Sequence, residues 1–341
     1  MATQEGEITE AVDLCAPNGR LAPEARGWSR VPLHCANLHG RFGRTKRWDY
    51  WAILTDDLAI SATYSDVDYL GIVEVWWCEL AGGRTGGRSV NAPLARGISL
   101  PDRPGSAPLR FDSRNLTVDM VDDPSGTRVQ AHWIERDGTP GRLDAFIELP
   151  PGHESVNVVI PWSDTTFQYT SKHQARPARG ELVVGDAAHR FGDESDAWGV
   201  LDVGRGRWPY RTNWNWGGGA GRGSAGHVVG LQLGGKWTVG TGATENGLIV
   251  DGRVSKIGAE LEWDYSWDRP LEPWRVRAPD GSVDLELTPR FVKPTDLNVG
   301  VMQMVVRQVF GTWRGSARTD DGVTVTFTDL LGFAEECRAK W

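Results

Sequence analysis

The chain has 341 residues, a length that fits one large domain or two ordinary ones. With 40% hydrophobic and 24% charged residues, its composition is typical of a globular protein and excludes a disordered or collagen-like chain. The net charge of −8 argues against a protein that binds nucleic acid by neutralising phosphates. The unusual counts are 17 Trp and 42 Gly, since Trp is too bulky to accumulate by chance in a small core.

Targeting and metal-binding signals are weak along the whole sequence. Residues 1–14 are acidic and contain no Lys or Arg, which is the wrong charge for a secretory or transit peptide. No apolar run approaches the roughly 18 residues that a membrane helix needs. The four cysteines are too widely spaced for a zinc pattern and too few for a disulfide scaffold. We therefore expect a cytoplasmic protein with no membrane segment, no metal and no nucleic-acid partner.

The predicted elements are almost all strands. Residues 1–27 are expected to form an extended tail because Pro and Gly interrupt any period there. Alternation of apolar and polar residues predicts strands around 116–120, 260–267 and 323–327. Hairpin turns are predicted at Asp137-Gly138, Asp251-Gly252, Asp280-Gly281 and Asp320-Asp321-Gly322. Apart from one short helix near the C-terminus, no helical period is found, so the class is all-β and antiparallel.

Internal similarity suggests a duplicated unit. The segment 172–180, with Lys172 and Arg179-Gly180, resembles 307–315, with Arg307 and Arg314-Gly315. Further on, 199–202 and 205–208 resemble 332–335 and 338–341, and the Trp-rich segment 47–51 resembles 211–216. We predict two β-barrel domains, 28–205 and 206–341, because about 135 residues suffice for a barrel of eight to ten strands that can hold one small ligand.

Several Trp-containing segments carry a resemblance to a known family. The segments are 26–30, 46–51, 200–210, 213–216, 244–246 and 332–335, and they span nearly the whole chain. In them the sequence resembles the bacterial family called domain of unknown function 2804. More distantly it is similar to two-domain lipocalin-like proteins that include carotenoid hydratases and tocopherol cyclases. The resemblance implies a two-barrel fold but assigns no catalytic residue.

The densest group of candidate residues lies between 198 and 219. Trp214 and Trp216 would project from one face of a strand about 7 Å apart, while Asn213 and Asn215 face the other way. Trp208 and Trp237 would extend this aromatic wall, and the glycines 217–219 would allow a ligand or another backbone to approach. The wall is interpreted either as one side of an apolar pocket or as a Trp-rich barrel core.

Two carboxylates are the candidate catalytic acids. Asp202 lies in an otherwise apolar strand near Arg205, so it is either a structural ion-pair partner or a buried acid with a raised pKa. The matching Glu335 in the repeat favours the structural interpretation. Glu245, followed by Asn246, has no visible repeat partner and comes after a strand of small residues.

These residues leave three functions open. The first is an enzyme that needs no cofactor and hydrates, isomerises or cyclises an isoprenoid or polyene, with Asp202 or Glu245 as the acid. Its ligand-binding residues would be Trp208, Trp214, Trp216, Trp237 and Asn246, with Arg205 or Arg211 tuning the acid or holding a polar end of the substrate. The second is a carrier of an apolar ligand without catalysis. The third, less favoured, is a carbohydrate-active protein with exposed Trp faces. The sequence does not indicate the oligomeric state.

Overall fold

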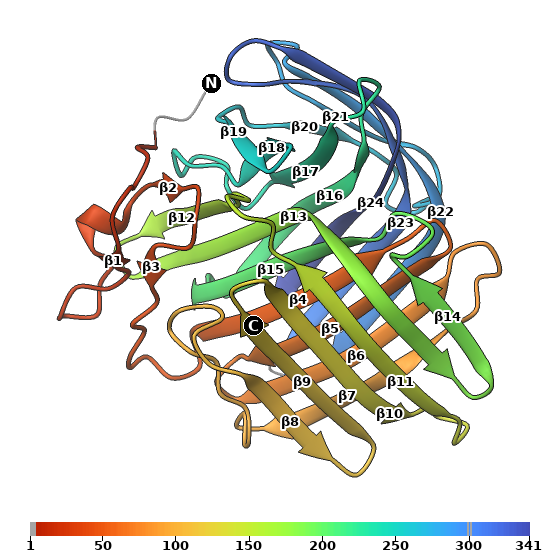
Figure 1. Cartoon of the computed structure of the whole chain (residues 1–341). Coiled ribbons are helices and arrows are strands. Elements are labelled where there is room, and N and C mark those ends of the chain that lie inside the picture. Colours follow the sequence, from red (N-terminus) through yellow and green to blue (C-terminus); the bar gives the residue numbers. More distant parts are fainter. Residues whose placement is uncertain (1–4, 299, 301) are drawn as a thin grey trace.

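The computed structural model describes residues 5–298, 300 and 302–341, and within these ranges the chain forms antiparallel β-structure without an α-helix. A single 3-10 turn, η1 (Pro23–Ala25), is the helical element of these ranges. The all-β prediction is confirmed, and the strands are gathered into two large curled sheets (Figure 1).

The first sheet is built from the strands that precede residue 208. Its main path runs β7-β6-β5-β4-β15-β13-β11-β10-β9-β8, with β12, β14 and β2 attached through β13 and β12. The strands are β2 (Trp28–Ser29), β4 (Thr45–Leu54), β5 (Leu58–Asp66), β6 (Leu70–Glu79), β7 (Thr85–Pro93), β8 (Leu109–Ser113), β9 (Leu116–Asp123), β10 (Gly126–Ile134), β11 (Pro140–Glu148), β12 (Val156–Ser163), β13 (Thr166–Val184), β14 (Ala187–Phe191) and β15 (Trp198–Arg207).

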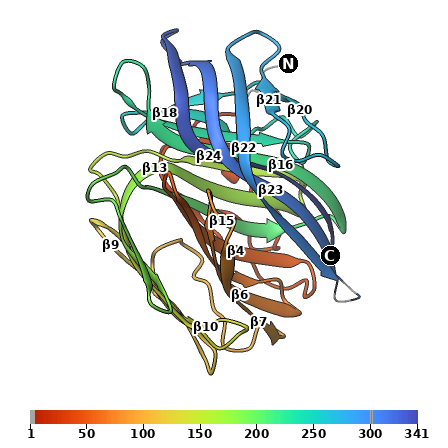
Figure 2. The same cartoon turned by 90° about the vertical axis from the view of Figure 1, so that its right-hand side faces the viewer.

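The second sheet is built from the strands that follow residue 210. Its path runs β19-β18-β17-β16-β24-β23-β22-β21-β20. The strands are β16 (Arg211–Arg222), β17 (Val228–Gly235), β18 (Asn246–Val250), β19 (Arg253–Ile257), β20 (Glu262–Asp264), β21 (Trp274–Arg277), β22 (Val283–Asn298), β23 (Gln303–Arg318) and β24 (Thr324–Lys340). Figure 2 shows the two sheets as curled half-barrels packed against each other.

The two sheets repeat one strand order. The order β7-β6-β5-β4-β15-β13-β11-β10-β9 in the first corresponds to the complete path of the second, from β19 to β20. Gly180 and Gly315 occupy matching strand positions with φ of 156° and 134°. A Cβ would lie 2.2 Å from the Asp144 carbonyl oxygen at the first and 2.1 Å from the Asp284 carbonyl oxygen at the second, so only glycine fits. This geometry agrees with the duplication inferred from the sequence.

The change of sheet falls close to the domain boundary proposed from the sequence. The first sheet ends at Arg207 and the second begins at Arg211, whereas the proposed boundary follows residue 205. Residues 5–27 lie against the first sheet, where Leu14, Leu21 and Ala25 pack on Phe167 and Tyr169. A further two-stranded sheet pairs β1 (Val12–Asp13) with β3 (His34–Cys35).

Two predicted elements differ in the structure. The short helix expected near the C-terminus is wrong, because these residues form the long strand β24. Both faces of β24 are buried, with Leu330 and Ala334 in the core of the second sheet and Phe333 and Cys337 against the first. A strand buried on both faces loses the apolar–polar alternation by which a strand is recognised. The strand predicted over 260–267 is shorter, and β20 spans only three residues.

Apolar side chains form separate cores within the sheets and between them. The first sheet encloses residues such as Trp77 and Trp133, and the second encloses Trp274 and Trp313. A third region lies between the sheets, where Trp208 and Trp237 belong to one buried cluster. The faces of β13, β15, β16 and β24 that meet there carry the polar residues described next.

Candidate functional site

A buried ammonium lies at the centre of the junction between the two sheets. Lys172, on β13, places its Nζ 2.8 Å from Oδ1 of Asp202 on β15 and 3.2 Å from Oε2 of Glu245. Glu245 directly precedes β18 of the other sheet. Nζ also lies 4.4 Å from the ring centre of Trp216 on β16. The two candidate acids named from the sequence are therefore brought together around one cation.

Asp202 is held entirely by hydrogen-bond donors. Lys172 contacts Oδ1, Trp48 Nε1 donates to Oδ2 at 3.1 Å, and the Thr170 hydroxyl donates to Oδ1 at 3.3 Å. A carboxylate with donors on both oxygens is satisfied in its ionised form. Asp202 is thus an ion-pair partner, and its partner is Lys172 rather than the neighbouring Arg205.

Glu245 is the most deeply buried of these acids. Its side chain is 1% exposed, and Trp237 Nε1 donates to its Oε1 at 2.7 Å. Burial raises the pKa of Glu245, an effect that the positive charge of Lys172 opposes. For Lys172, burial disfavours the charged form, but Asp202 and Glu245 outweigh it and raise its pKa. The cluster of Lys172, Asp202 and Glu245, here called the ion triad, therefore keeps its ammonium charged.

Glu335, on β24, is a third buried carboxyl at the same junction. Trp214 Nε1 donates to its Oε1 at 2.8 Å, and among the described residues no hydrogen bond to its Oε2 is found. Burial raises the pKa of Glu335 to about 7, against the lowering effects of the Trp214 hydrogen bond and the charge of Lys172. This acid is therefore partly protonated at neutral pH, and one of its oxygens is free to donate a proton.

The predicted aromatic wall exists, and it lies between the sheets. Trp208 is its centre, with ring centroids 5.3 Å from Trp237, 5.7 Å from Trp214 and 5.7 Å from Trp48. Trp216 lies on the same face of β16 but packs against Tyr50 and Phe333 instead. The wall adjoins the acids directly, because Trp48, Trp214 and Trp237 each donate an indole N–H to one of the three carboxyl groups.

The side chains of three other predicted residues make their contacts with groups other than the three acids. Arg205 is fully buried on the opposite face of β15, where it pairs with Asp49 at 2.6 Å. Arg211 is exposed at the start of β16 and lines a surface depression. Asn246 is buried, accepts from the Gly234 N–H and donates to the Ala259 carbonyl, so its amide is occupied by backbone.

The space around glycines 217–219 is filled by other parts of the protein. A Cβ at Gly218 would lie 2.6 Å from Nε2 of Gln174, and one at Gly219 would lie 2.9 Å from Cδ1 of Trp313. These positions therefore let side chains from both sides of β16 pack closely. The region also contains His173, whose pKa burial lowers well below its usual value, so it remains neutral.

Lys172 and the chemical role of Glu335 are the features that sequence reasoning missed. Lys172 was visible only as part of a repeated motif, and its contact with Asp202 depends on the pairing of β13 with β15. Glu335 was recognised as the repeat partner of Asp202, which was interpreted as a sign of a structural role. The sequence did contain one signal for this site, because each of the two acids has a matching Trp in its own repeat, Trp48 for Asp202 and Trp214 for Glu335.

The fold and the site define an all-β protein of two duplicated curled sheets with acids and Trp residues at their junction. Residues 5–341 match the family model described as domain of unknown function 2804, and the chain belongs to this family. The resemblance seen in the Trp-containing segments is thereby confirmed. A search of curated proteins found no match.

A solved structure supports the fold, and a second is less similar. A candidate AttH of Nitrosomonas europaea is similar with a TM-score of 0.54 and 12% identity, over 87% of this chain and 93% of that one. Kievitone hydratase of Nectria haematococca gives a TM-score of 0.49 at 11% identity, over 88% and 89% of the two chains. At 12% identity, the likeness to the AttH structure shows the fold alone. In the described ranges, no helix is long and apolar enough to cross a membrane.

Proposed function

We propose that the protein is an enzyme that protonates an apolar small molecule, of isoprenoid or polyene type, at the junction of the two sheets. The reaction would be a hydration, an isomerisation or a cyclisation and would require no cofactor. The observation that carries this proposal is Glu335, an acid whose pKa is raised to about 7 beside a wall of Trp rings. Of the three buried carboxyl groups, it is the one for whose second oxygen no hydrogen bond or ion pair is found among the described residues.

The proposed reaction begins at Oε2 of Glu335. The Oε2–H bond breaks, the proton forms a new C–H bond with one carbon of a substrate double bond, and the neighbouring carbon becomes a cation. In a hydration, water adds to this cation and returns one proton to Glu335. In an isomerisation or cyclisation, loss of a proton from carbon to Glu335 restores the acid. In each case the carboxyl group is regenerated and atoms balance.

The environment is suited to a developing cation. The faces of Trp208 and Trp214 present negative π-density, and aromatic faces stabilise positive charge. The ion triad also acts on the acid, since the negative charge of Asp202 favours protonated Glu335 and the positive charge of Lys172 opposes it. We propose that Asp202 and Glu245 act here as charge partners, with Glu335 as the proton donor.

An apolar substrate would contact side chains that the sheets leave half-buried at this junction. Around the buried cluster of Trp208 and Trp237, both sheets contribute partly exposed apolar residues, namely Trp48, Tyr69, Leu70, Ile72, Trp214, Leu297, Met304 and Val306. Carbohydrate binding is less well supported, since all 17 Trp residues, each within the described ranges, are buried or half-buried rather than exposed as platforms.

The test uses an apolar extract of the source organism in D₂O. Carboxyl protons exchange with solvent, so a substrate carbon protonated by Glu335 acquires deuterium, which mass spectrometry detects in the product. Wild-type protein is expected to label one or more compounds, and Glu335→Gln is expected to label none, because an amide cannot supply the proton. Glu262→Gln, at an exposed carboxylate of β20, is the matched control and should label as wild type does.

Two results would overturn the proposal. Equal labelling by Glu335→Gln and wild type would place the proton donor elsewhere. Recovery of an apolar compound that binds unchanged and unlabelled would identify a carrier of an apolar ligand instead. In that case the Trp wall alone would account for binding, and truncating Trp214 would weaken it while Glu335→Gln would not.

A further inference from the structure

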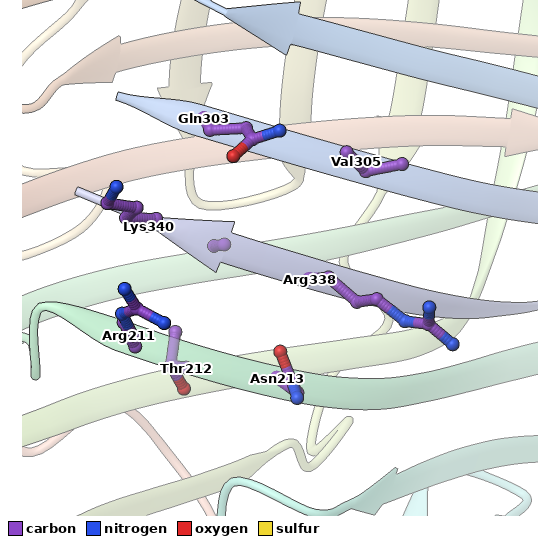
Figure 3. A pocket seen from close by; sticks show the side chains of 8 residues that line it. Arg211, Thr212, Asn213, Gln303, Val305, Arg338 and Lys340 are labelled. Carbon is purple, nitrogen blue, oxygen red and sulfur yellow. The ribbon is translucent and has the colours of Figure 1, made fainter. Parts of the chain in front are cut away.

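An open depression of about 570 Å³ lies on the second sheet, on the face opposite to Glu335. It is lined by Arg211, Thr212 and Asn213 of β16, Gln303 and Val305 of β23, and Arg338, Ala339 and Lys340 of β24 (Figure 3). Along β24, Arg338 shares its face with Glu336 and Ala334, whereas Glu335 and Cys337 face the junction. The depression is thus separated from the proposed acid by the sheet itself.

Its lining is cationic, and among the described residues one of its cations has an ion pair, Arg338 with Glu336 at 2.9 Å. Three of the eight lining residues carry positive charge, and none is Asp or Glu, although the chain as a whole has a net charge of −8. In the part of the chain that the structure describes, no ion pair is found for Arg211 or Lys340. These groups are therefore available to an anion from outside the chain.

In two other surface depressions, the clustered arginines are paired with acidic side chains. In one, Arg142 pairs with Glu181 at 2.5 Å, and in the other, Arg314 pairs with Glu286 at 2.5 Å. In both, acidic side chains stand among the arginines and neutralise them. The depression on β16, β23 and β24 differs because its lining contains no acidic residue and leaves Arg211 and Lys340 without an ion pair among the described residues.

The duplication identifies what occupies the equivalent place in the first half. The strand registers that match Asp202 with Glu335 also match Arg205 with Arg338 and Arg207 with Lys340. Arg205 is fully buried and pairs with Asp49, and it donates to the Trp48 carbonyl at 2.7 Å. In the first half, Arg205 is thus satisfied by oxygen atoms of the chain itself.

The other matching cation of the first half, Arg207, is satisfied by the N-terminal region. Arg207 donates to the carbonyl oxygens of Gly19 and His39, both of which lie outside the repeated strands. No corresponding segment is found over Lys340 among the described residues. At the position of Asp49 the second half carries Asn215, a neutral amide that donates to the Tyr265 hydroxyl and to the Glu335 carbonyl.

Arg338 is held in place for binding. Its guanidinium lies 3.8 Å from the ring centre of Trp267, and its Nε donates to Oε1 of Glu336 at 2.9 Å. These contacts fix the side chain while no hydrogen bond of its terminal nitrogens is found within the described ranges. A guanidinium whose geometry is already fixed loses less entropy when it binds a carboxylate or phosphate.

From these observations we infer a second binding site, in which Arg211, Arg338 and Lys340 take the carboxylate or phosphate group of an anionic small molecule. The ligand's oxygens would occupy the places that Asp49 and the backbone carbonyls of the N-terminal region fill in the first half. The volume of the depression is in the range of small-molecule sites. The inference does not depend on catalysis by Glu335.

The experiment measures binding of two probes, inorganic pyrophosphate and citrate, to the full chain by isothermal titration calorimetry at low salt. Wild-type protein is expected to bind at least one probe, which tells a phosphate ligand from a carboxylate ligand. The triple variant Arg211→Gln, Arg338→Gln, Lys340→Gln should lose about tenfold or more in affinity, since charge-assisted hydrogen bonds are removed.

The matched control is the double variant Arg275→Gln, Arg314→Gln, which removes two cations from the self-neutralised depression on β21 and β23. Its affinity for the probe should stay at the wild-type value. Circular dichroism establishes that each variant is folded, and the single variant Lys340→Gln provides a milder second test. Absence of binding by wild type, or an equal loss in the control, would overturn the inference.

Discussion

The two halves of the molecule carry the same Trp–carboxyl pair in two different chemical states. In the first half Trp48 donates to Asp202, and in the second Trp214 donates to Glu335. The pairs occupy matching positions, since Trp48 and Trp214 lie on matching strands, as do the two acids. One acid is locked in an ion pair, whereas burial raises the pKa of the other to about 7.

One register position accounts for much of this difference. The residue opposite Asp202 on the neighbouring strand is Lys172, and the residue opposite Glu335 is Gln308. A cation in contact keeps a carboxylate ionised, whereas a neutral amide leaves the cost of burial uncompensated. Duplication therefore supplies two acids, and their neighbours place one in an ion pair and leave the other with a raised pKa, the property that we propose serves proton transfer.

The largest expected effect comes from removing the cation of the first half. Lys172→Met leaves Asp202 and Glu245 buried without their shared partner, so it should destabilise the fold by about 3–5 kcal/mol. Urea denaturation measures this loss. The matched control is Lys293→Met, whose pair with Glu74 is more exposed and should cost about 1 kcal/mol or less. Equal losses would show that the ion triad stabilises the fold no more than the more exposed pair does.

The second prediction concerns stability against pH in the second half. Because the folded pKa of Glu335 is raised from 4.5 to about 7, the folded state holds a proton that the unfolded state releases. Its contribution is present below pH 4.5 and is lost as pH rises to 7, a change on the order of 3 kcal/mol. Subtracting the profile of Glu335→Gln, measured by urea denaturation at each pH, isolates this slope. A difference profile that is flat from pH 4.5 to 7 would contradict the assigned pKa.

The third prediction makes the second half resemble the first. Gln308→Lys places an ammonium opposite Glu335, as Lys172 stands opposite Asp202, and should lower the pKa of Glu335 by about 1–3 units. The pH dependence of product deuteration should then move to lower pH. Gln308→Met serves as the control that removes the amide without adding charge. An unchanged profile in Gln308→Lys would mean that this position does not set the difference between the halves.

The sequence predicted the all-β class and the duplication because both leave local signals. The segments 205–208 and 338–341 match in sequence, and in the structure they occupy matching ends of β15 and β24. The projection of Trp214 and Trp216 from one face also follows directly from strand geometry. The C-terminal strand was mistaken for a short helix because burial on both faces removes alternation.

The site could be predicted only in part, because it depends on contacts between distant residues. Asp202 and Glu245 were named as candidate acids, but their shared partner Lys172 comes from a third strand. The pairing of β13 with β15 includes a bulge after His173, where Ala175 has φ of 56°, and sequence spacing does not reveal it. The raised pKa of Glu335 likewise arises from the packing of one sheet on the other.

Glu335 is the acid that we propose as the proton donor, and its pKa can be measured directly. Protein labelled with ¹³C at the glutamate side-chain carboxyls is titrated by NMR, and Glu335→Gln identifies the signal. A midpoint at about 7 is predicted. A midpoint below about 5, in the range of an ordinary glutamate, would show that Glu335 is ionised at neutral pH and is not the proton donor.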